Sequence, residues 1–409
     1  MKKQREVIKV FEYEVLKLGD KFKKSHLKAF SNFNALHEDR YFDIRYNGIR
    51  FKNFVGVVQV DGLTVEILPK IDSRETDKDL WQGVLIEMLK TTRKLKVQKI
   101  GQANVNRQNI HLLDIYFEWF LTEVELLIRQ GLIKQYYTET KNVNALKGKL
   151  EFAGHIRKNL VHKEKFYTTH QVYEKDHLIH QVLALALSII EGFSKGTYLY
   201  SRCKSVQLDF PEVKPIKINP TTFGRIKNSR KSAPYKNALE IARFIILNYA
   251  PNISSGDEKM LALLFDMNSL WEEYMLVKMK KAALKLEDTE VYGQSSKEFW
   301  QGITIRPDIV VKKRDQVYVI DTKWKNIQNF KPSTQDLRQM YVYNDYWKSV
   351  QSMLLYPATK TIVPDFKNFK ARDHQCAVGR LNIIENGKLK AEIGKEILDW
   401  YEFSGLKDL

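Results

Sequence analysis

Two strand-like runs separated by a short charged turn constrain the fold of this chain more than any other feature. The runs cover residues 303–311 and 316–321, and the turn between them reads Lys-Lys-Arg-Asp. Antiparallel pairing across such a turn predicts a β-hairpin. In that hairpin Asp308 of the first strand and Asp321 of the second come close together, several residues away from the turn.

A lysine joins these two carboxylates. Lys323 follows Asp321 by two positions, so both side chains point to one face of a strand. Mg²⁺ is usually held by one or two carboxylates and fills its remaining positions with water and substrate phosphate. Lys323 would position or deprotonate the attacking water and offset charge on the phosphate. The patch therefore predicts metal-dependent hydrolysis of a phosphodiester.

The alternative interpretation of this patch is a set of solvated charges at the end of a hairpin. An Asp-x-Lys triplet downstream of Pro-Asp arises easily by chance in a chain with 28% charged residues. The triplet alone does not separate the two interpretations.

The overall charge favours an anionic partner. The 409 residues include 67 Lys and Arg against 49 Asp and Glu, a formal net charge of +18. Basic side chains neutralise phosphates with release of counterions, so nucleic acid is the first candidate. The alternative is a basic composition shared by the proteins of the source organism.

Several other classes of protein do not fit the sequence. Cys203 and Cys376 are the only cysteines and form no CxxC pair, so neither a structural zinc site nor a disulfide framework is expected. The first 20 residues carry charges where a signal peptide needs an apolar core, and no run of about 18 apolar residues occurs. The sequence therefore predicts a soluble, cytoplasmic protein without a membrane partner.

The length predicts two or three domains. Residues 4–72 look β-rich, and the Asp-Gly turn between 55–60 and 63–68 is the strongest hairpin signal of the N-terminal half. Helical periodicity appears in residues 22–36, 79–132, 176–193, 237–249, 258–286 and 333–347. Short strands and turns are predicted in 134–160, a turn-rich stretch in 194–236 and a buried strand in 352–356.

The best linker candidate is residues 250–257, APNISSGD. It predicts an α+β N-terminal region over residues 1–255, with a β-rich start plus helices in one or two subdomains. Residues 256–409 are then expected to form an α/β domain with a mixed central sheet flanked by helices.

Basic side chains gather in residues 224–236, GRIKNSRKSAPYK. The sequence favours a solvated charge run here. The alternative is a flexible loop that contacts nucleic acid or a protein partner. Together with the lysine that ends the second strand-like segment, this alternative gives the predicted nucleic-acid contacts Arg225, Lys227, Arg230, Lys231 and Lys325.

Three polar residues lie on the predicted helices that flank the hairpin. Glu272 is at the edge of the apolar stripe of helix 258–286, where the sequence favours an exposed side chain over a carboxylate that reaches a metal site. Gln339 and Tyr343 are four residues apart on helix 333–347 and so are neighbours on one face.

The order of these motifs resembles that of the PD-(D/E)xK nuclease superfamily, in which a helix, two strands and a second helix follow one another. The segments FDMNSLWEEY, RPDIVV, IDTKWK and QMYVY are similar to those of the McrC family, the nuclease subunit of the McrBC modification-dependent restriction system. In the N-terminal half, VGVVQVDGLTVEILPKID and LKGKLEFAGHIRKN resemble signatures of the same family. The likeness therefore covers most of the chain.

The resemblance implies roles for individual residues. Asp308 and Asp321 would hold Mg²⁺, for which Mn²⁺ can substitute, and Thr322 would offer its carbonyl oxygen. Lys323 would serve the attacking water, and Glu272 would be an accessory acid. Two residues would support the site from the next helix, namely Gln339 and Tyr343.

The resemblance also implies a partner. Family members act with McrB, a hexameric AAA+ GTPase that recognises modified DNA, and the N-terminal half of McrC docks on that motor and stimulates it. The absence of a Walker-type GxxxxGK(S/T) motif in this chain agrees with that division of labour. The implied substrate is double-stranded DNA carrying modified bases. The alternatives are a non-cleaving DNA-binding or motor-docking adaptor on a nuclease-like fold and an RNA-processing nuclease.

Overall fold

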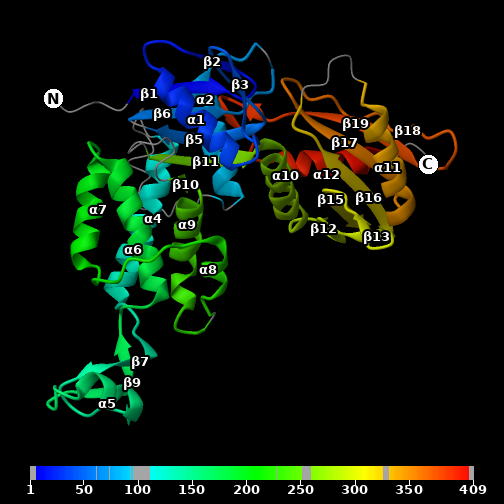
Figure 1. Ribbon diagram of the computed structural model, residues 1–409. Helices are drawn as coiled ribbons and strands as arrows, with labels where there is room; N and C mark the ends of the chain where they lie inside the picture. Colours follow the sequence, from blue (N-terminus) through cyan, green and yellow to red (C-terminus); the bar gives the residue numbers. More distant parts are fainter. Residues whose placement is uncertain are drawn as a thin grey trace. The chain divides into compact units, whose positions relative to one another are not determined.

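The computed structural model divides into two compact units (Figure 1). The first contains residues 102–251 with residues 1–4, and the second contains residues 5–101 with 252–409. The structure describes residues 6–60, 62–72, 74–92, 94, 111–227, 229–250, 259–325 and 331–404, with side chains to residue 401.

This division differs from the predicted one, which placed residues 1–255 together. Strand β11 (Met260–Asp266) pairs antiparallel with β5 (Phe54–Val60) along its whole length. The β-rich start therefore belongs to the same unit as the C-terminal part of the chain. The predicted linker itself falls on residues that lie almost entirely outside the described ones.

The N-terminal sheet of the second unit contains the hairpin predicted around Asp-Gly. β5 and β6 (Leu63–Leu68) pair antiparallel, and β1 (Glu6–Phe11) adds to β6 in parallel. Every residue of β5 and β6 is buried, which is typical of a strand covered on both faces. The other elements of this segment are β2 (Val15–Lys17), α1 (Lys24–Leu36), β3 (Phe42–Arg45), β4 (Gly48–Phe51) and α2 (Lys78–Thr91).

The C-terminal part of the unit contains the predicted mixed sheet. Its order is β12-β15-β16-β17-β19-β18, with β16, β17 and β19 parallel and the other neighbours antiparallel. The strands are β12 (Thr289–Gly293), β15 (Ile309–Lys313), β16 (Gln316–Thr322), β17 (Gln351–Ala358), β18 (Lys367–Asn368) and β19 (Gln375–Asn382).

Helices cover both faces of this sheet (Figure 1). On one face α11 (Thr334–Trp347) packs its Met340 and Trp347 against Val319 of β16. On the other face the ring of Tyr318 packs against the ring of Tyr401 in α12 (Ile393–Ser404), with 4.5 Å between the ring centroids. Successive residues of a strand point to opposite faces, so β16 is held between two helical layers. α10 (Met267–Ala283) packs beside α12, and β20 (Ile384–Glu385) pairs with β21 (Lys388–Leu389).

The two runs predicted to pair do so, with one difference. β15 and β16 form the antiparallel hairpin, but the first run is broken at Pro307, which has no backbone N–H for a sheet. Its first residues form β14 (Ile303–Ile305), which pairs instead with β13 (Lys297–Trp300).

The helix predicted over residues 258–286 is wrong in its first part. Residues Met260–Asp266 are the strand β11, and the helix begins only at Met267, capped by Asp266. A short continuous apolar run has no period that separates a strand from a helix. Pairing with β5 decides the outcome.

The first unit is a helical group that carries an extended ribbon (Figure 1). The ribbon is the antiparallel pair β7 and β9, with β8 and the short helix α5 at its end. Three helices, α5, α7 and the short α8, form where strands or turns were predicted. α7 does so because Leu199, Cys203 and Val206 share one buried face. The elements are α4 (Leu112–Gln130), β7 (Gln135–Val143), β8 (Lys149–Leu150), α5 (Phe152–Asn159), β9 (Phe166–Glu174), α6 (Leu178–Ser194), α7 (Tyr198–Asp209), α8 (Pro220–Gly224), α9 (Lys236–Leu247) and β10 (Tyr249–Ala250). Among the helices of the described segments, none has both the length and the apolar character needed to span a membrane.

A buried glutamate connects the N-terminal sheet to the strand that carries Asp321. The Trp324 Nε1–H donates to Glu12 Oε1 at 2.6 Å, and the backbone N–H of Lys70 donates to the same oxygen at 3.0 Å. Trp324 also packs against the rings of Trp271 and Trp81. Burial raises the pKa of Glu12 to about 7, although both hydrogen bonds oppose the shift.

Stability is therefore expected to depend on pH through Glu12. Because its pKa is about 7 in the folded state against an ordinary value of 4.5, the folded state binds the proton more tightly. The free energy of unfolding should fall by at most about 3 kcal/mol as pH rises from 4.5 to 7, and then level off. Urea unfolding at pH 4.5 and pH 8 should show this loss in the parent and a smaller one in Glu12→Gln. Glu6→Gln, at an exposed position of β1, should behave like the parent.

Candidate active site

The hairpin brings two carboxylates together at the end of the mixed sheet. Ile309 pairs with Ile320, so the preceding Asp308 lies beside Asp321. Asp308 Oδ2 accepts hydrogen bonds from the backbone N–H of Thr322 at 2.7 Å and from its hydroxyl at 2.9 Å. Asp321 is only 1% exposed. The pair is therefore held in a fixed and largely dry environment.

Lys323 completes this group from the same strand end. Its Nζ lies 2.5 Å from Asp321 Oδ2, as the shared face of a strand predicts. Its backbone N–H donates to the carbonyl of Leu355 on β17 at 2.9 Å, which extends the parallel pairing by one residue beyond β16. The ammonium is thus fixed from both its main chain and its carboxylate partner.

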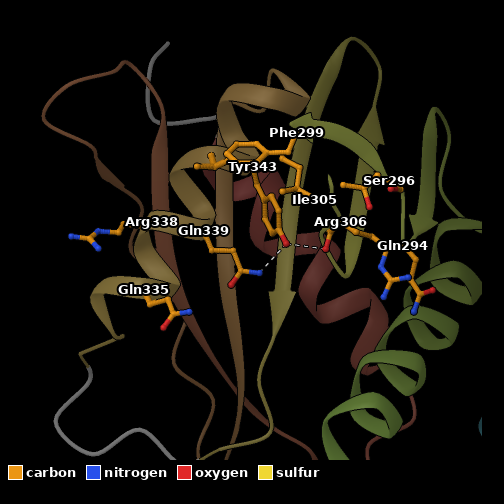
Figure 2. Close-up of a pocket in the computed structure, with 11 residues that line it drawn as sticks. Gln294, Ser296, Phe299, Ile305, Arg306, Gln335, Arg338, Gln339 and Tyr343 are labelled. Atoms are coloured by element: carbon orange, nitrogen blue, oxygen red, sulfur yellow. Dashed lines mark hydrogen bonds between the residues drawn. The ribbon is translucent and has the colours of Figure 1, made fainter. Parts of the chain in front are cut away.

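Helix α11 supports the carboxylates through a chain of hydrogen bonds. Gln339 Nε2 donates to Asp321 Oδ1 at 3.2 Å and to the Tyr343 hydroxyl at 2.8 Å. Tyr343 in turn donates to the Arg306 carbonyl at 2.8 Å (Figure 2). Because Arg306 stands two residues before Asp308, the helix restrains both strands of the hairpin at once. The four-residue spacing of Gln339 and Tyr343 is what places them on one face.

Glu272 is half-buried, which corrects the exposed position that the sequence favoured. Its Oε1 accepts a hydrogen bond from Gln294 Nε2 at 3.0 Å. Burial, followed by repulsion from Asp308, raises the pKa of Glu272. Packing of α10 brings the start of this helix close enough to the β15–β16 hairpin for the Glu272 carboxylate to be repelled by Asp308.

The electrostatics of the group are those of crowded carboxylates with one cation. Burial and the neighbouring Asp308 raise the pKa of Asp321 to about 7, and burial raises the pKa of Asp308. Burial acts to lower the pKa of Lys323, but the nearby carboxylates, with Asp321 first, outweigh it and raise that pKa. Shifts of this kind concentrate at functional sites, although structural ion pairs also cause them.

The donor set fits a hard divalent cation held by few protein ligands. Among the described residues, no group of three or more His, Cys, Asp or Glu side chains is arranged to hold a metal ion. The two carboxylates that come together are those of Asp308, which accepts the Thr322 hydrogen bonds, and Asp321, which pairs with Lys323. One or two carboxylates are the usual protein contribution to a Mg²⁺ site.

The predicted nucleic-acid contacts fall in different places. Lys325 follows the group on the same segment, where its Nζ lies 3.1 Å from Asp336 Oδ2. The other four belong to the first compact unit. Three of these, with Lys134, line a pocket of about 490 Å³, namely Arg225, Lys227 and Lys231. The fourth, Arg230, lies in the turn before the 3₁₀ segment Ala233–Tyr235.

Sequence reasoning missed the residues that surround a groove beside the carboxylates. The groove has a volume of about 790 Å³ and is lined by Gln339 and Tyr343 together with Arg306, Arg338 and Phe299 (Figure 2). The two arginines stand next to predicted site residues in the sequence, one before Pro307-Asp308 and one before Gln339. This adjacency to predicted site residues was the sequence signal that could have identified the two arginines.

The fold and this group define a mixed α/β protein with two carboxylates and a lysine brought together at the end of a central sheet. The family model described as "McrBC 5-methylcytosine restriction system component" matches residues 49–357. The chain therefore belongs to this family and is a component of a McrBC-type restriction system, which confirms the predicted McrC membership.

Two known proteins resemble the chain over much of its length. The Type IV methyl-directed restriction enzyme EcoKMcrBC of Escherichia coli (strain K12) is 23% identical over 293 residues, which cover 65% of this chain and 83% of that protein. A chain in the refined half-complex from the tetradecameric assembly of Thermococcus gammatolerans McrB AAA+ hexamers with bound McrC is 19% identical, with a TM-score of 0.70 over 96% of this chain and 99% of that chain. The second likeness concerns the fold.

Proposed function

We propose that this chain is the Mg²⁺-dependent endonuclease subunit of its restriction system and that it cleaves double-stranded DNA carrying modified bases. The observation that carries the proposal is the group formed by buried Asp321 with the half-buried Asp308 and Lys323 at the end of β16. Two carboxylates with raised pKa values beside a lysine are suited to phosphodiester hydrolysis.

Each residue of the group has a distinct task in this proposal. Asp308 and Asp321 would hold Mg²⁺ with the carbonyl oxygen of Thr322, and Mn²⁺ would substitute for it. When bound, the ion would supply Lewis-acid stabilisation of charge on the phosphate. Lys323 would orient the attacking water and offset developing negative charge. The topology around these residues supports a PD-(D/E)xK endonuclease domain in residues 256–409.

The neighbouring residues hold this arrangement in place. Gln339 and Tyr343 link Asp321 to the backbone before Asp308 and would keep the two carboxylates in register. Glu272 would act as an accessory acid, because its raised pKa and its interaction with Asp308 bring it into the electrostatic environment of the site. Substrate DNA would also contact Lys325 and the basic residues Arg225, Lys227, Arg230 and Lys231.

The partner in this proposal is an McrB-like AAA+ GTPase hexamer whose hydrolysis the chain stimulates. The solved structure with a similar fold comes from an assembly of McrB AAA+ hexamers with bound McrC, which supports such a partner. Residues 1–255 would provide the docking region. The complex would act on DNA in the cytoplasm.

Metal titration tests the proposal directly. Calorimetry with Mn²⁺ should show binding by the parent chain and by Asp315→Asn, which changes an exposed acid in the turn of the hairpin. Binding should be lost in the double variant Asp308→Asn, Asp321→Asn. Cleavage of modified DNA by the chain with its GTPase partner should stop when EDTA removes Mg²⁺ and return when Mg²⁺ is added.

Two results would contradict the proposal. Cleavage that persists in EDTA would exclude the metal-dependent mechanism. Absence of Mn²⁺ binding, together with retained binding of DNA and the GTPase, would identify a non-cleaving adaptor instead.

A further inference from the structure

A groove of about 790 Å³ lies beside the candidate active site, and the site assignment gives no role to its other lining residues such as Phe299, Arg306 and Arg338. One wall is the hairpin of β13 and β14, and the other is α11 (Figure 2). Gln339 and Tyr343 lie in the groove and also make the hydrogen bonds that hold Asp321 and the Arg306 carbonyl. The groove therefore lies next to the carboxylate pair, separated from Asp321 by the side chain of Gln339.

Two exposed arginines place positive charge in this groove. Arg306 comes from the segment before Asp308, and Arg338 comes from α11, with Gln339 and Tyr343 between them in Figure 2. Arg306 is close enough to Asp308 and Glu272 to act on both carboxylates electrostatically. A phosphate approaching these acids is repelled by them, and the arginines compensate for that repulsion.

An exposed aromatic side chain forms part of the hairpin wall. Phe299 is 46% exposed, lines the groove and packs against the Tyr346 ring at 5.6 Å. The β13–β14 hairpin is anchored to α11, because Lys297 Nζ donates to the Tyr346 carbonyl at 2.7 Å. Its two-residue turn, Gln301-Gly302, has positive φ at both positions, as a tight type I′ hairpin requires. The ring is thus presented on a fixed support.

We propose that this groove binds the DNA strand next to the phosphate that is cut. Arg306 and Arg338 contact backbone phosphates of that strand, and Phe299 packs against a sugar or base. The proposal rests on the proposed nuclease function and deepens it by assigning the substrate's path. Guanidinium groups suit phosphate oxygens, and aromatic rings stack on any base, so this lining binds a strand without reading its sequence.

The closeness of the groove to the carboxylates favours DNA over a protein partner, because Gln339 of its lining contacts Asp321. An acidic loop of another protein would also satisfy the two arginines. Such a loop would, however, block the approach of substrate to Asp308 and Asp321. We therefore treat protein binding as an outcome of the test.

DNA binding by the full chain is the first measurement, made in a Lys323→Ala parent so that no cutting interferes. The probe is a duplex with 5-methylcytosine, and salt is varied around ~0.1 M. In the double variant Arg306→Ala, Arg338→Ala, affinity should fall about tenfold, and the slope of log affinity against log salt should fall by about two. Phe299→Ala should weaken binding and leave that slope unchanged, because the ring carries no charge.

Arg372→Ala is the matched control. This exposed arginine precedes β19, whose first residue pairs with the first residue of β17. Because β16, β17 and β19 are parallel and Asp321 lies near the C-terminal end of β16, Arg372 lies toward the other end of these strands. The DNA affinity of this variant, and its slope of log affinity against log salt, should equal those of the parent. The same measurements are repeated with the GTPase partner present.

The outcomes separate the groove from the nuclease assignment. Unchanged affinity and slope in the double arginine variant would overturn the groove proposal, as would absence of DNA binding by the parent with and without the GTPase. Reduced association with the GTPase, with DNA binding intact, would assign the groove to a protein segment and also overturn it. If the otherwise unmodified chain cuts no DNA with Mg²⁺ but the arginine variants lose DNA binding, the nuclease function fails and the groove stands.

Discussion

Replacing Lys323 by alanine is expected to reduce cleavage of modified DNA by about 10²- to 10⁴-fold while the chain stays folded and bound to its GTPase partner. Lys323 is the only cation within 4 Å of Asp321 among the described residues, so its loss removes the group that would orient the water and balance charge on the phosphate. The measurement is single-turnover cleavage with saturating partner. Lys367→Ala, on the edge strand β18, is the control and should cut like the parent.

The companion change Asp308→Asn tests the same site with less disturbance of the fold. An asparagine retains an oxygen that accepts the two Thr322 hydrogen bonds, and it removes the negative charge. Cleavage should fall as steeply as in Lys323→Ala, with a melting temperature close to that of the parent. Full activity in either variant would remove this group from the mechanism and with it the central reason for assigning a nuclease.

Replacing Gly56 by alanine is expected to cost more than about 4 kcal/mol of folding free energy. Gly56 lies in the middle of β5 with φ +139, a conformation that L residues rarely adopt. A Cβ added there would overlap the carbonyl oxygen of Leu263 on β11. Thermal unfolding followed by circular dichroism should show a large loss, because the β5–β11 pair joins residues 5–101 to residues 252–409.

Gly83→Ala is the matched control for this change. Gly83 lies within α2, and a Cβ added there meets no atom within 4 Å. Alanine lowers the entropy of the unfolded chain and favours the helix, so this variant should gain roughly 0.5–1 kcal/mol. Similar stabilities for the two variants would show that β5 and β11 do not pack as closely as described.

Local patterns were sufficient wherever an element is defined by its own residues. The Asp-Gly hairpin of β5 and β6, the capped helix α11 and the charged turn between β15 and β16 were all predictable. In each case the signal is short-range: a turn residue, a cap or an alternation of side chains. The approach of Asp308 to Asp321 followed from the turn for the same reason.

Sequence patterns gave the wrong structure, or no prediction, where contacts with residues far along the chain determine the conformation or burial of a segment. Residues Met260–Asp266 have an apolar run compatible with either a helix or a strand, and β5, about 200 residues earlier, supplies the edge that makes them a strand. Glu272 is half-buried for a related reason, because the packing of α10 places its carboxylate beside Gln294 and near Asp308, which are distant from it in the chain. Glu12 gave no sequence signal, since its burial depends on Trp324.

The sequence by itself determined the chemistry available to this protein: an acid, an acid–x–lysine triplet whose charged residues are two positions apart, and flanking residues whose spacing put them on shared faces. Those facts follow from strand and helix geometry, which acts over a few residues. Only the tertiary structure decided that the β-rich start belongs to the same unit as this site and that a groove lined by Arg306, Arg338 and Phe299 lies beside it. Both depend on contacts between residues far apart in the chain, and these are fixed by the burial of complementary surfaces.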